Sequence, residues 1–175
     1  MWARALLAAA FAMPVAAAAQ EPDTYRELLV QYRCAVVDRL QQIYAATDTA
    51  HPQNWFLIVY FAAQPNDYVQ CVFDPKTYMF CEAASGFYDN VATQPRTRWL
   101  SKDAITALGR LGFSTDDTAD NFRIGFDVAD PPDFNGIADF ILKALHDGFS
   151  ARANDALEFN APLAPHATAK CNPVS

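Results

Sequence analysis

The chain has 175 residues, of which 52% are hydrophobic, and its 20 acidic residues outnumber its 13 Lys and Arg residues. This length is sufficient for one domain with a buried core. The formal net charge of -7 argues against the basic surfaces that bind nucleic acid or anionic membranes.

Residues 1–19 have the order of a secretory signal peptide. Arg4 is followed by an apolar run and then by small residues that end at Ala19. A charged start, a short apolar middle and small residues at the exit are typical of export signals. The run is also shorter than the roughly 20 residues that span a bilayer. We therefore predict cleavage near Ala19, a periplasmic or secreted location, and no membrane anchor.

Residues 23–46 are predicted to form the first helix, with Asp23 or Thr24 as its N-cap. Apolar side chains recur in it at helical spacing, which places them on one stripe. The stripe contains Tyr25, Leu28, Leu29, Tyr32, Val36, Leu40 and Ile43. Cys34 lies nearly opposite this stripe, on the outer side of the helix.

Three strands are predicted next, at residues 55–63, 68–73 and 78–85. The first is a nearly continuous apolar run, which is typical of a central strand buried on both faces. The turns between the strands, at 64–67 and 74–77, are short. Consecutive strands joined by short turns indicate an antiparallel meander.

The second half of the chain predicts a helix, a strand and another helix. Ser101 is the expected N-cap of the first of these helices. Residues 121–128 alternate apolar and polar side chains, which predicts a strand with one buried face. Asp133 is the expected N-cap of the final helix, which ends near Phe149.

The predicted fold class is α+β: helix, three-stranded antiparallel meander, helix, one or two further strands, and helix. Residues 20–155 are assigned to a single domain. Residues 156–175, which are rich in Pro and Ala, are assigned to an extended C-terminal tail.

The chain contains four cysteines, and an even number in an exported protein indicates disulfides. Three pairings are possible. We favour Cys71–Cys81 together with Cys34–Cys171. The first pair requires a register in which the two cysteines lie opposite each other, because a slip of one residue would send them to different faces. The second pair would fasten the tail to the outer side of the first helix.

No catalytic, cofactor-binding or metal-ligating residue is predicted. The acidic stretch contains Asp116, Asp117, Asp120 and Asn121. It lacks the ligand spacing and the closing Glu of a calcium loop, so we interpret it as a solvated loop. The histidines are His51, His146 and His166. Their spacing does not support a zinc site, and no nucleophile motif is present.

Aromatic residues supply the candidate binding face. A three-stranded sheet has two faces, and a few helices cannot cover both of them. The candidates for an uncovered groove are Trp55, Tyr60, Tyr68, Tyr78 and Tyr88. The alternative is that these rings pack in the core or at the sheet edges, as most aromatic residues do.

Several short motifs suggest a family. They are "YVQ" at 68–70, Glu82, Ser85, "LGF" at 111–113, "NF" at 121–122, Asp127 and the closing helix at 137–149. With them, residues 23–150 resemble the YbjN-like and type III secretion chaperone-like (TY-Chap) domains. The resemblance implies a non-catalytic scaffold that holds peptides or protein segments on a sheet or helix face, often as a dimer.

Two functions of different classes are therefore expected. The leading one is an exported, envelope- or stress-related module that binds a protein or peptide, with a homodimer as an option and no enzymatic activity. The alternative is a small-molecule binder or an unrecognised hydrolase. Its pocket would lie between the sheet and the third helix, with Glu82, Asp127 or His146 as polar groups. A purely structural envelope protein is a third option.

Overall fold

The computed structural model describes residues 24–46, 51–74, 77–89, 100–116 and 120–168. The predicted signal peptide at 1–19 lies outside these residues. The described helices are α1 (Thr24–Ala45), α2 (Lys102–Arg110) and α3 (Phe134–Phe149), with short 3₁₀ turns η1 (Pro52–Asn54) and η2 (Phe87–Asp89). The described strands are β1 (Phe56–Phe61), β2 (Gln64–Asp74), β3 (Tyr78–Ala83), β4 (Phe122–Asp127) and β5 (Leu157–Asn160). This element order confirms the predicted α+β class.

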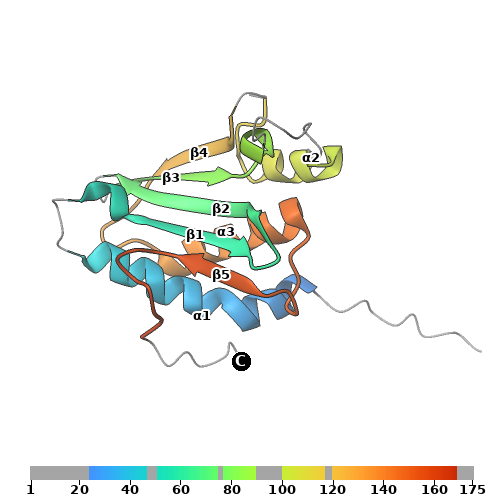
Figure 1. Cartoon of the computed structure of the whole chain (residues 1–175). Coiled ribbons are helices and arrows are strands. Elements are labelled where there is room, and N and C mark those ends of the chain that lie inside the picture. The colour runs from blue at the N-terminus through green and yellow to red at the C-terminus, as the bar shows by residue number, and fades with distance from the viewer. Residues whose placement is uncertain (1–23, 47–50, 75–76, 90–99, 117–119, 169–175) are drawn as a thin grey trace, which may run out of the picture.

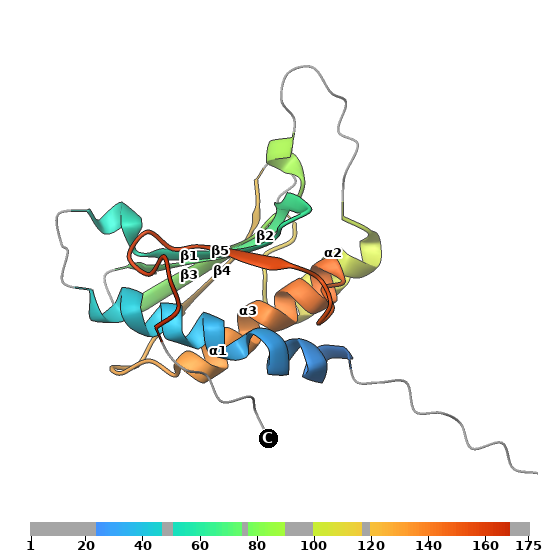
Figure 2. The same cartoon turned by 60° about the horizontal axis from the view of Figure 1, so that its bottom comes forward.

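The strands form one antiparallel sheet in the order β4-β3-β2-β1-β5. Helices α1 and α3 lie side by side in one layer against a single side of this sheet (Figures 1 and 2). Helix α2 packs against α3 at one end of the sheet. No helix in the described part of the chain is both long and apolar enough to cross a membrane.

The one-sided helical layer corrects the prediction that the first strand is buried on both faces. In β1, Leu57 and Val59 are fully buried, whereas Phe56 and Ile58 are only partly buried. Leu57 and Val59 point toward the helices, and Phe56 and Ile58 point to the opposite side. The apolar run therefore serves two different surfaces.

The turn after β1 also differs from the prediction. The chain turns at Ala62 and Ala63, and β2 already begins at Gln64, where a turn was expected. The pairing of β1 with β2 shifts its register between Tyr60 and Phe61. Such an irregularity is where a strand tolerates a proline, and Pro65 follows directly.

The sheet extends beyond the boundary predicted at residue 155. β5 pairs with the outer edge of β1, so the first part of the predicted tail belongs to the fold. Beyond β5 the chain returns along α1. There the Thr168 amide donates to Asp38 Oδ2 at 2.7 Å, and Gln42 Nε2 donates to the carbonyl of His166 at 3.1 Å.

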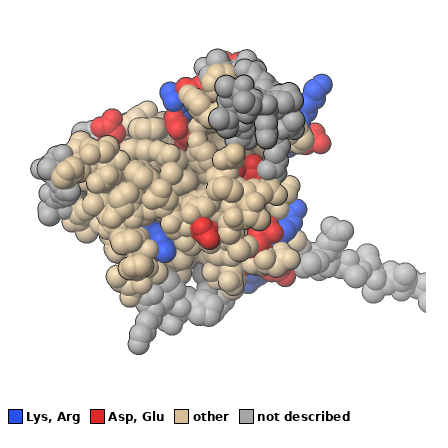
Figure 3. All heavy atoms as spheres, viewed as in Figure 1, with Lys and Arg blue, Asp and Glu red and all other residues tan. Residues whose placement is uncertain are grey.

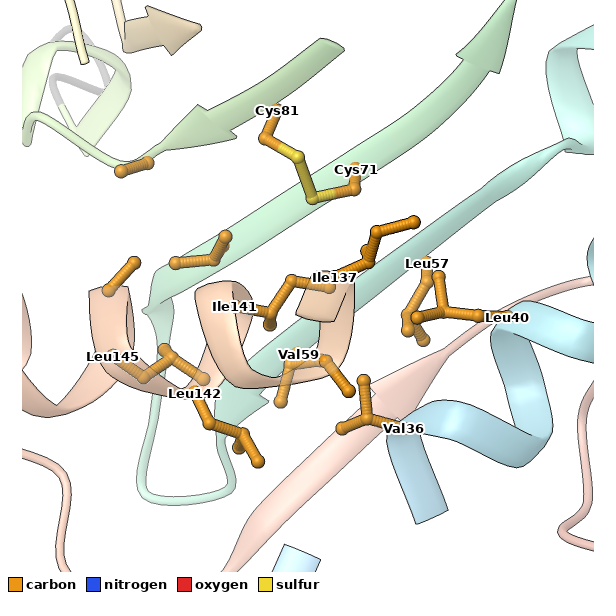
Figure 4. Close-up of a cluster of buried hydrophobic side chains, with 14 of the residues drawn as sticks. Val36, Leu40, Leu57, Val59, Cys71, Cys81, Ile137, Ile141, Leu142 and Leu145 are labelled. Carbon is orange, nitrogen blue, oxygen red and sulfur yellow. A yellow bond between two sulfur atoms is a disulfide. The ribbon is translucent and has the colours of Figure 1, made fainter. Parts of the chain in front are cut away.

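The core lies between the sheet and the α1–α3 layer (Figure 4). The predicted stripe of α1 faces it, with Leu28, Val36, Leu40 and Ile43 buried. The corresponding residues of α3 are Ile137, Ala138, Ile141 and Leu145.

The predicted Cys71–Cys81 disulfide is present and lies on the core side of the sheet. The two cysteines are directly opposite each other in β2 and β3, with Cα atoms 4.1 Å apart. Cys34 is also disulfide-bonded. Its predicted partner, Cys171, lies outside the described residues. A disulfide is compatible with an oxidising compartment.

The predicted N-caps of α2 and α3 are confirmed, whereas Thr24 is the first residue of α1 and Asp23 lies outside the described residues. Ser101 Oγ accepts from the Ala104 amide at 3.1 Å, and Asp133 Oδ1 accepts from the Gly136 amide at 3.0 Å. These side chains satisfy backbone donors that a helix start leaves unpaired. The caps thereby fix where α2 and α3 begin.

Candidate functional site

The side of the sheet opposite α1 and α3 has no helix over it among the described residues (Figure 2). We call it the open face. Its side chains in β1 to β4 are Phe56, Ile58, Tyr60, Tyr68, Gln70, Val72, Tyr78, Phe80, Glu82, Arg123 and Asp127, together with Gly125. Figure 3 looks onto this face and shows a broad area free of Lys, Arg, Asp and Glu.

Three of the predicted binding-face residues lie on the open face. Tyr60 and Tyr68 are paired across β1 and β2, and Tyr78 lies further along β3 with 40% of its surface exposed. Tyr60 donates a hydrogen bond to Glu158 of β5 at 2.9 Å. This bond to the carboxylate raises the pKa of the Tyr60 phenol.

Trp55 and Tyr88 lie elsewhere. Trp55 is only 7% exposed and belongs to the core, because it shares the phase of Leu57 and Val59. Its assignment to the binding face is therefore corrected. Tyr88 is exposed in η2, beyond the end of β3.

Tyr88 belongs to a charged cluster at this end of the sheet. Its hydroxyl donates to Asp120 Oδ1 at 2.8 Å, which raises the pKa of Tyr88 and lowers that of Asp120. Arg123 pairs with Asp120 at 2.9 Å and with Glu82 at 2.6 Å. The cluster thereby holds the end of the acidic stretch against β3 and β4.

A second polar group ties the same loop to the sheet, and sequence reasoning did not find it. Asn121, which is 6% exposed, donates from Nδ2 to Tyr68 Oη at 2.7 Å and accepts from the Ser85 amide at 3.3 Å. Ser85 Oγ in turn donates to the carbonyl of Asp120 at 2.7 Å. Buried polar groups are usually satisfied in this way, so we assign these residues a structural role.

The rest of the acidic stretch shows no ligand geometry where it is described. Asp116 accepts from Ser114 Oγ at 2.6 Å, which lowers the pKa of the Asp116 carboxyl. Asp117 lies outside the described residues. Among the residues that are described, no three His, Cys, Asp or Glu side chains come together in a metal-ligand group.

His146 takes part in a hydrogen-bond chain between α1 and α3. Its Nε2 lies 3.0 Å from Thr24 Oγ1, and its Nδ1 lies 2.7 Å from Asp147 Oδ1. The order hydroxyl, imidazole and carboxylate is that of nucleophilic hydrolases. However, these three residues line none of the described pockets. We therefore interpret these hydrogen bonds as a structural connection between α1 and α3.

A groove lies between β4 and α3, as the small-molecule alternative anticipated. It has a volume of 460 Å³, and Asp127 is one of its lining residues. The other alternative residues are elsewhere, with Glu82 on the open face and His146 beside Thr24. The three polar groups named for a hydrolase are therefore not brought together.

The groove is mainly apolar. Its lining comprises Leu111, Ile124, Phe126, Asp127, Val128, Ala129, Asp133, Gly136, Ile137 and Phe140. Phe140 stacks on Phe113 at 5.4 Å between ring centroids and meets Phe126 edge-on at 6.0 Å. We call this depression the β4 groove. It exists because the helical layer covers the centre of the sheet more fully than its β4 side.

The backbone edge of β4 runs along the β4 groove. β4 is the last strand on this side of the sheet, and the Ser114 amide donates to the Arg123 carbonyl there at 2.7 Å. Because strand residues alternate in direction, the amide and carbonyl groups of Gly125 and Asp127 also point outward. No described strand pairs with them. Groove, edge and open face thus meet at β4.

The chain was compared with protein-family models, with curated proteins and with solved structures, and no match was found in any of the three. The resemblance to chaperone-like domains therefore stays a prediction.

Proposed function

We propose that this protein is an exported, non-catalytic module that binds extended segments of other polypeptides at the edge of β4. The observation that carries the proposal is that the edge of β4, with which no described strand pairs beyond the Ser114 bridge, meets the apolar β4 groove on one side and the open face on the other.

An incoming strand would gain from both halves of this arrangement. Its backbone would bond to the outward amide and carbonyl groups of Gly125 and Asp127. Its alternate side chains would enter the β4 groove beside Phe126 and Phe140. Backbone bonds that supply affinity and pockets that select alternate side chains are how peptides bind by strand addition.

The environment predicted for the chain agrees with this function. The signal predicted at 1–19 directs the protein to a compartment where partly folded chains expose extended apolar segments. The Cys71–Cys81 disulfide fits such a location. The resemblance to chaperone-like domains implies the same class of ligand, and we retain it as part of the proposal.

A small apolar ligand is the second candidate, and the β4 groove alone favours it. Its volume of 460 Å³ lies within the range of small-molecule sites, about 300 to 1,000 Å³. An unpaired strand edge is not needed for such a ligand, whereas a polypeptide uses it. Edge and groove together favour the polypeptide.

The test is binding of the mature protein to an array of short unrelated peptides. We expect a subset to bind, and Val128→Asn to weaken that binding, because Val128 lines the β4 groove. Val30→Asn is the matched control, since Val30 is 42% exposed on α1. Absence of binding to every peptide would contradict the proposal. A large thermal shift with one metabolite and none with peptides would favour the second candidate.

A further inference from the structure

The chemistry of β4 defines which peptides fit, provided that the proposed function holds. We infer that the partner segment runs antiparallel to β4 and alternates apolar side chains with others, with Lys or Arg opposite Asp127. The register of the added strand follows from the direction in which the backbone groups of β4 point along the edge.

The Ser114–Arg123 hydrogen bond sets this register. It is an antiparallel bridge and occupies the outward carbonyl of Arg123. An added strand therefore starts its pairing beyond Arg123, at Gly125 and Asp127. Antiparallel addition matches every other pairing in the sheet, and it is slightly more stable per residue than parallel addition.

Side chains opposite Val128, Phe126 and Ile124 would point to the core side, because directly opposite residues in a pair share a face. That side is the β4 groove, which these three residues line. The first, third and fifth positions of the segment, in chain order, are therefore apolar. The described lining of the groove contains no Lys or Arg, so an acidic side chain at these positions would have no partner.

The second position lies opposite Asp127, on the open face. Asp74, Tyr78 and Asp127 form one row across β2, β3 and β4, in which a tyrosine separates two carboxylates. Glu82 is already paired with Arg123. Opposite charges that face each other across a strand pair stabilise it, so a Lys or Arg at this position extends the row favourably.

A second copy of the chain fits this edge poorly. In the antiparallel register that places Arg123 opposite Asp127 of the other copy, each Arg123 needs its outward backbone groups. Ser114 already binds that carbonyl. The register centred on Phe126 places Asp127 opposite Gly125 and provides no cation. A separate polypeptide with a Lys or Arg opposite Asp127 can pair with the backbone of Gly125 and Asp127 and also supply the missing cation.

The fourth position lies opposite Gly125 and beside the ring of Tyr78. Tyr78 extends over Gly125, where a side chain would collide with its hydroxyl. The ring is thus held at the surface that the fourth side chain would touch. We leave the identity of this position open to polar or β-branched residues.

The experiment measures affinity for the peptide Val-Lys-Leu-Thr-Val, with Gly and Ser at both ends, by calorimetry. A same-composition control, Val-Val-Leu-Lys-Thr, breaks the alternation. We expect the control to bind at least about tenfold more weakly, because Thr replaces Val in the groove at the fifth position and Lys no longer faces Asp127. Replacing Lys by Glu in the first peptide should weaken binding about fivefold. The Asp127→Lys protein should reverse this charge preference.

Backbone N-methylation distinguishes strand pairing in this register from non-specific hydrophobic binding. N-methylation at the second or fourth residue should abolish binding, because those amides donate to Asp127 and Gly125. N-methylation at the third should be tolerated, since its amide faces away from β4.

Each other outcome has a distinct meaning. Array peptides that bind without regard to alternation, charge or methylation would overturn this inference and leave the proposed function standing. If neither the array nor the designed peptide binds, the proposed function fails. A dimer of the free chain that the peptide dissociates would show that a second copy occupies the edge, and would also overturn the inference.

Discussion

Tyr78 of β3 lies across Gly125 of β4, so that a Cβ atom at Gly125 would overlap the tyrosine hydroxyl. The pair is diagonal, because Tyr78 is opposite Asp127 and Gly125 is opposite Phe80. An aromatic ring that covers a glycine on a neighbouring strand shields a backbone that would otherwise be bare. The contact also places Tyr78 beside the proposed strand-addition edge.

Gly125→Ala should therefore displace the Tyr78 ring. The overlapping atoms belong to the far end of a flexible side chain, so we expect rotation of the ring and not movement of the backbone. An alanine in a strand is otherwise about 0.5–1 kcal/mol more stable than a glycine. We expect that gain in a Tyr78→Ala background and little or none in the wild type, measured by urea unfolding. Equal effects in both backgrounds would refute the contact.

The Cys71–Cys81 disulfide should be a major source of stability. It closes a short loop, since the two residues are separated by 10 positions. Cys71→Ala with Cys81→Ala should lower the free energy of unfolding by about 3 kcal/mol in the chain-entropy model. A reductant cannot replace the variant, because Cys34 is disulfide-bonded as well. A loss below about 1 kcal/mol in urea unfolding would show that the cross-link matters little.

Gly148 permits the close packing of α2 on α3. A Cβ atom there would lie 2.8 Å from Cδ2 and 2.9 Å from Cγ of Leu108, which is fully buried. Gly148→Ala should therefore cost about 1–3 kcal/mol through overpacking. Gly109 in α2 is the matched control, because its Cβ would make an ordinary 3.5 Å contact with Thr115. Gly109→Ala should stabilise by up to about 1 kcal/mol; similar effects of the two variants in thermal unfolding would contradict this account.

The sequence predicted elements well where one periodicity ran unbroken. The stripe of α1 and the caps of α2 and α3 follow from local spacing. The Cys71–Cys81 pair also required the register of β2 and β3, which local spacing left open. β5 escaped prediction because it has four residues and contains a single clear apolar pair. Its place in the sheet depends on pairing with β1, and the local sequence pattern does not predict which strand it pairs with.

The site was less predictable, because it depends on what the helices leave uncovered. Tyr60, Tyr68 and Tyr78 share the open face by strand alternation, but the same alternation places Trp55 in the core. The β4 groove arises from the position of α3 relative to the sheet. That position is a matter of tertiary packing and has no counterpart in the pattern of β4.

Acid should weaken the contact of α3 with α1. Burial raises the pKa of Asp147, but hydrogen bonds from Lys143 and His146 outweigh it and leave the pKa below its usual value. A carboxyl with a lowered folded pKa stabilises the fold above its unfolded pKa, about 3.9, and this contribution is lost as the pH falls through the folded pKa.

Asp147→Asn should thus lower the free energy of unfolding by about 1 kcal/mol at neutral pH. The difference from wild type should shrink as the pH falls through the folded pKa of Asp147, which lies below the unfolded value of about 3.9. Urea unfolding at several pH values measures it, with Lys143→Gln as a companion that removes one donor. A difference that stays constant with pH would mean that the Asp147 charge does not contribute.

A buried carboxylate should contribute strongly to holding the tail against α1. Asp38 is 5% exposed, and it accepts from the Thr168 amide at 2.7 Å and from the Thr168 hydroxyl at 3.0 Å. Asp38→Asn removes the charge that strengthens both bonds. We expect it to lower the local opening free energy by about 2 kcal/mol, which is roughly a 30-fold faster amide exchange.

Hydrogen exchange of a peptide fragment that covers residues 161–168 measures this effect. Thr168→Val keeps the hydrogen bond from the backbone amide and loses the one from the hydroxyl, so it should have a smaller effect. Because β5 covers the edge of β1, loosening the tail should leave peptide binding at β4 unchanged. Unaltered exchange in Asp38→Asn would show that β5, and not the carboxylate, fixes the tail.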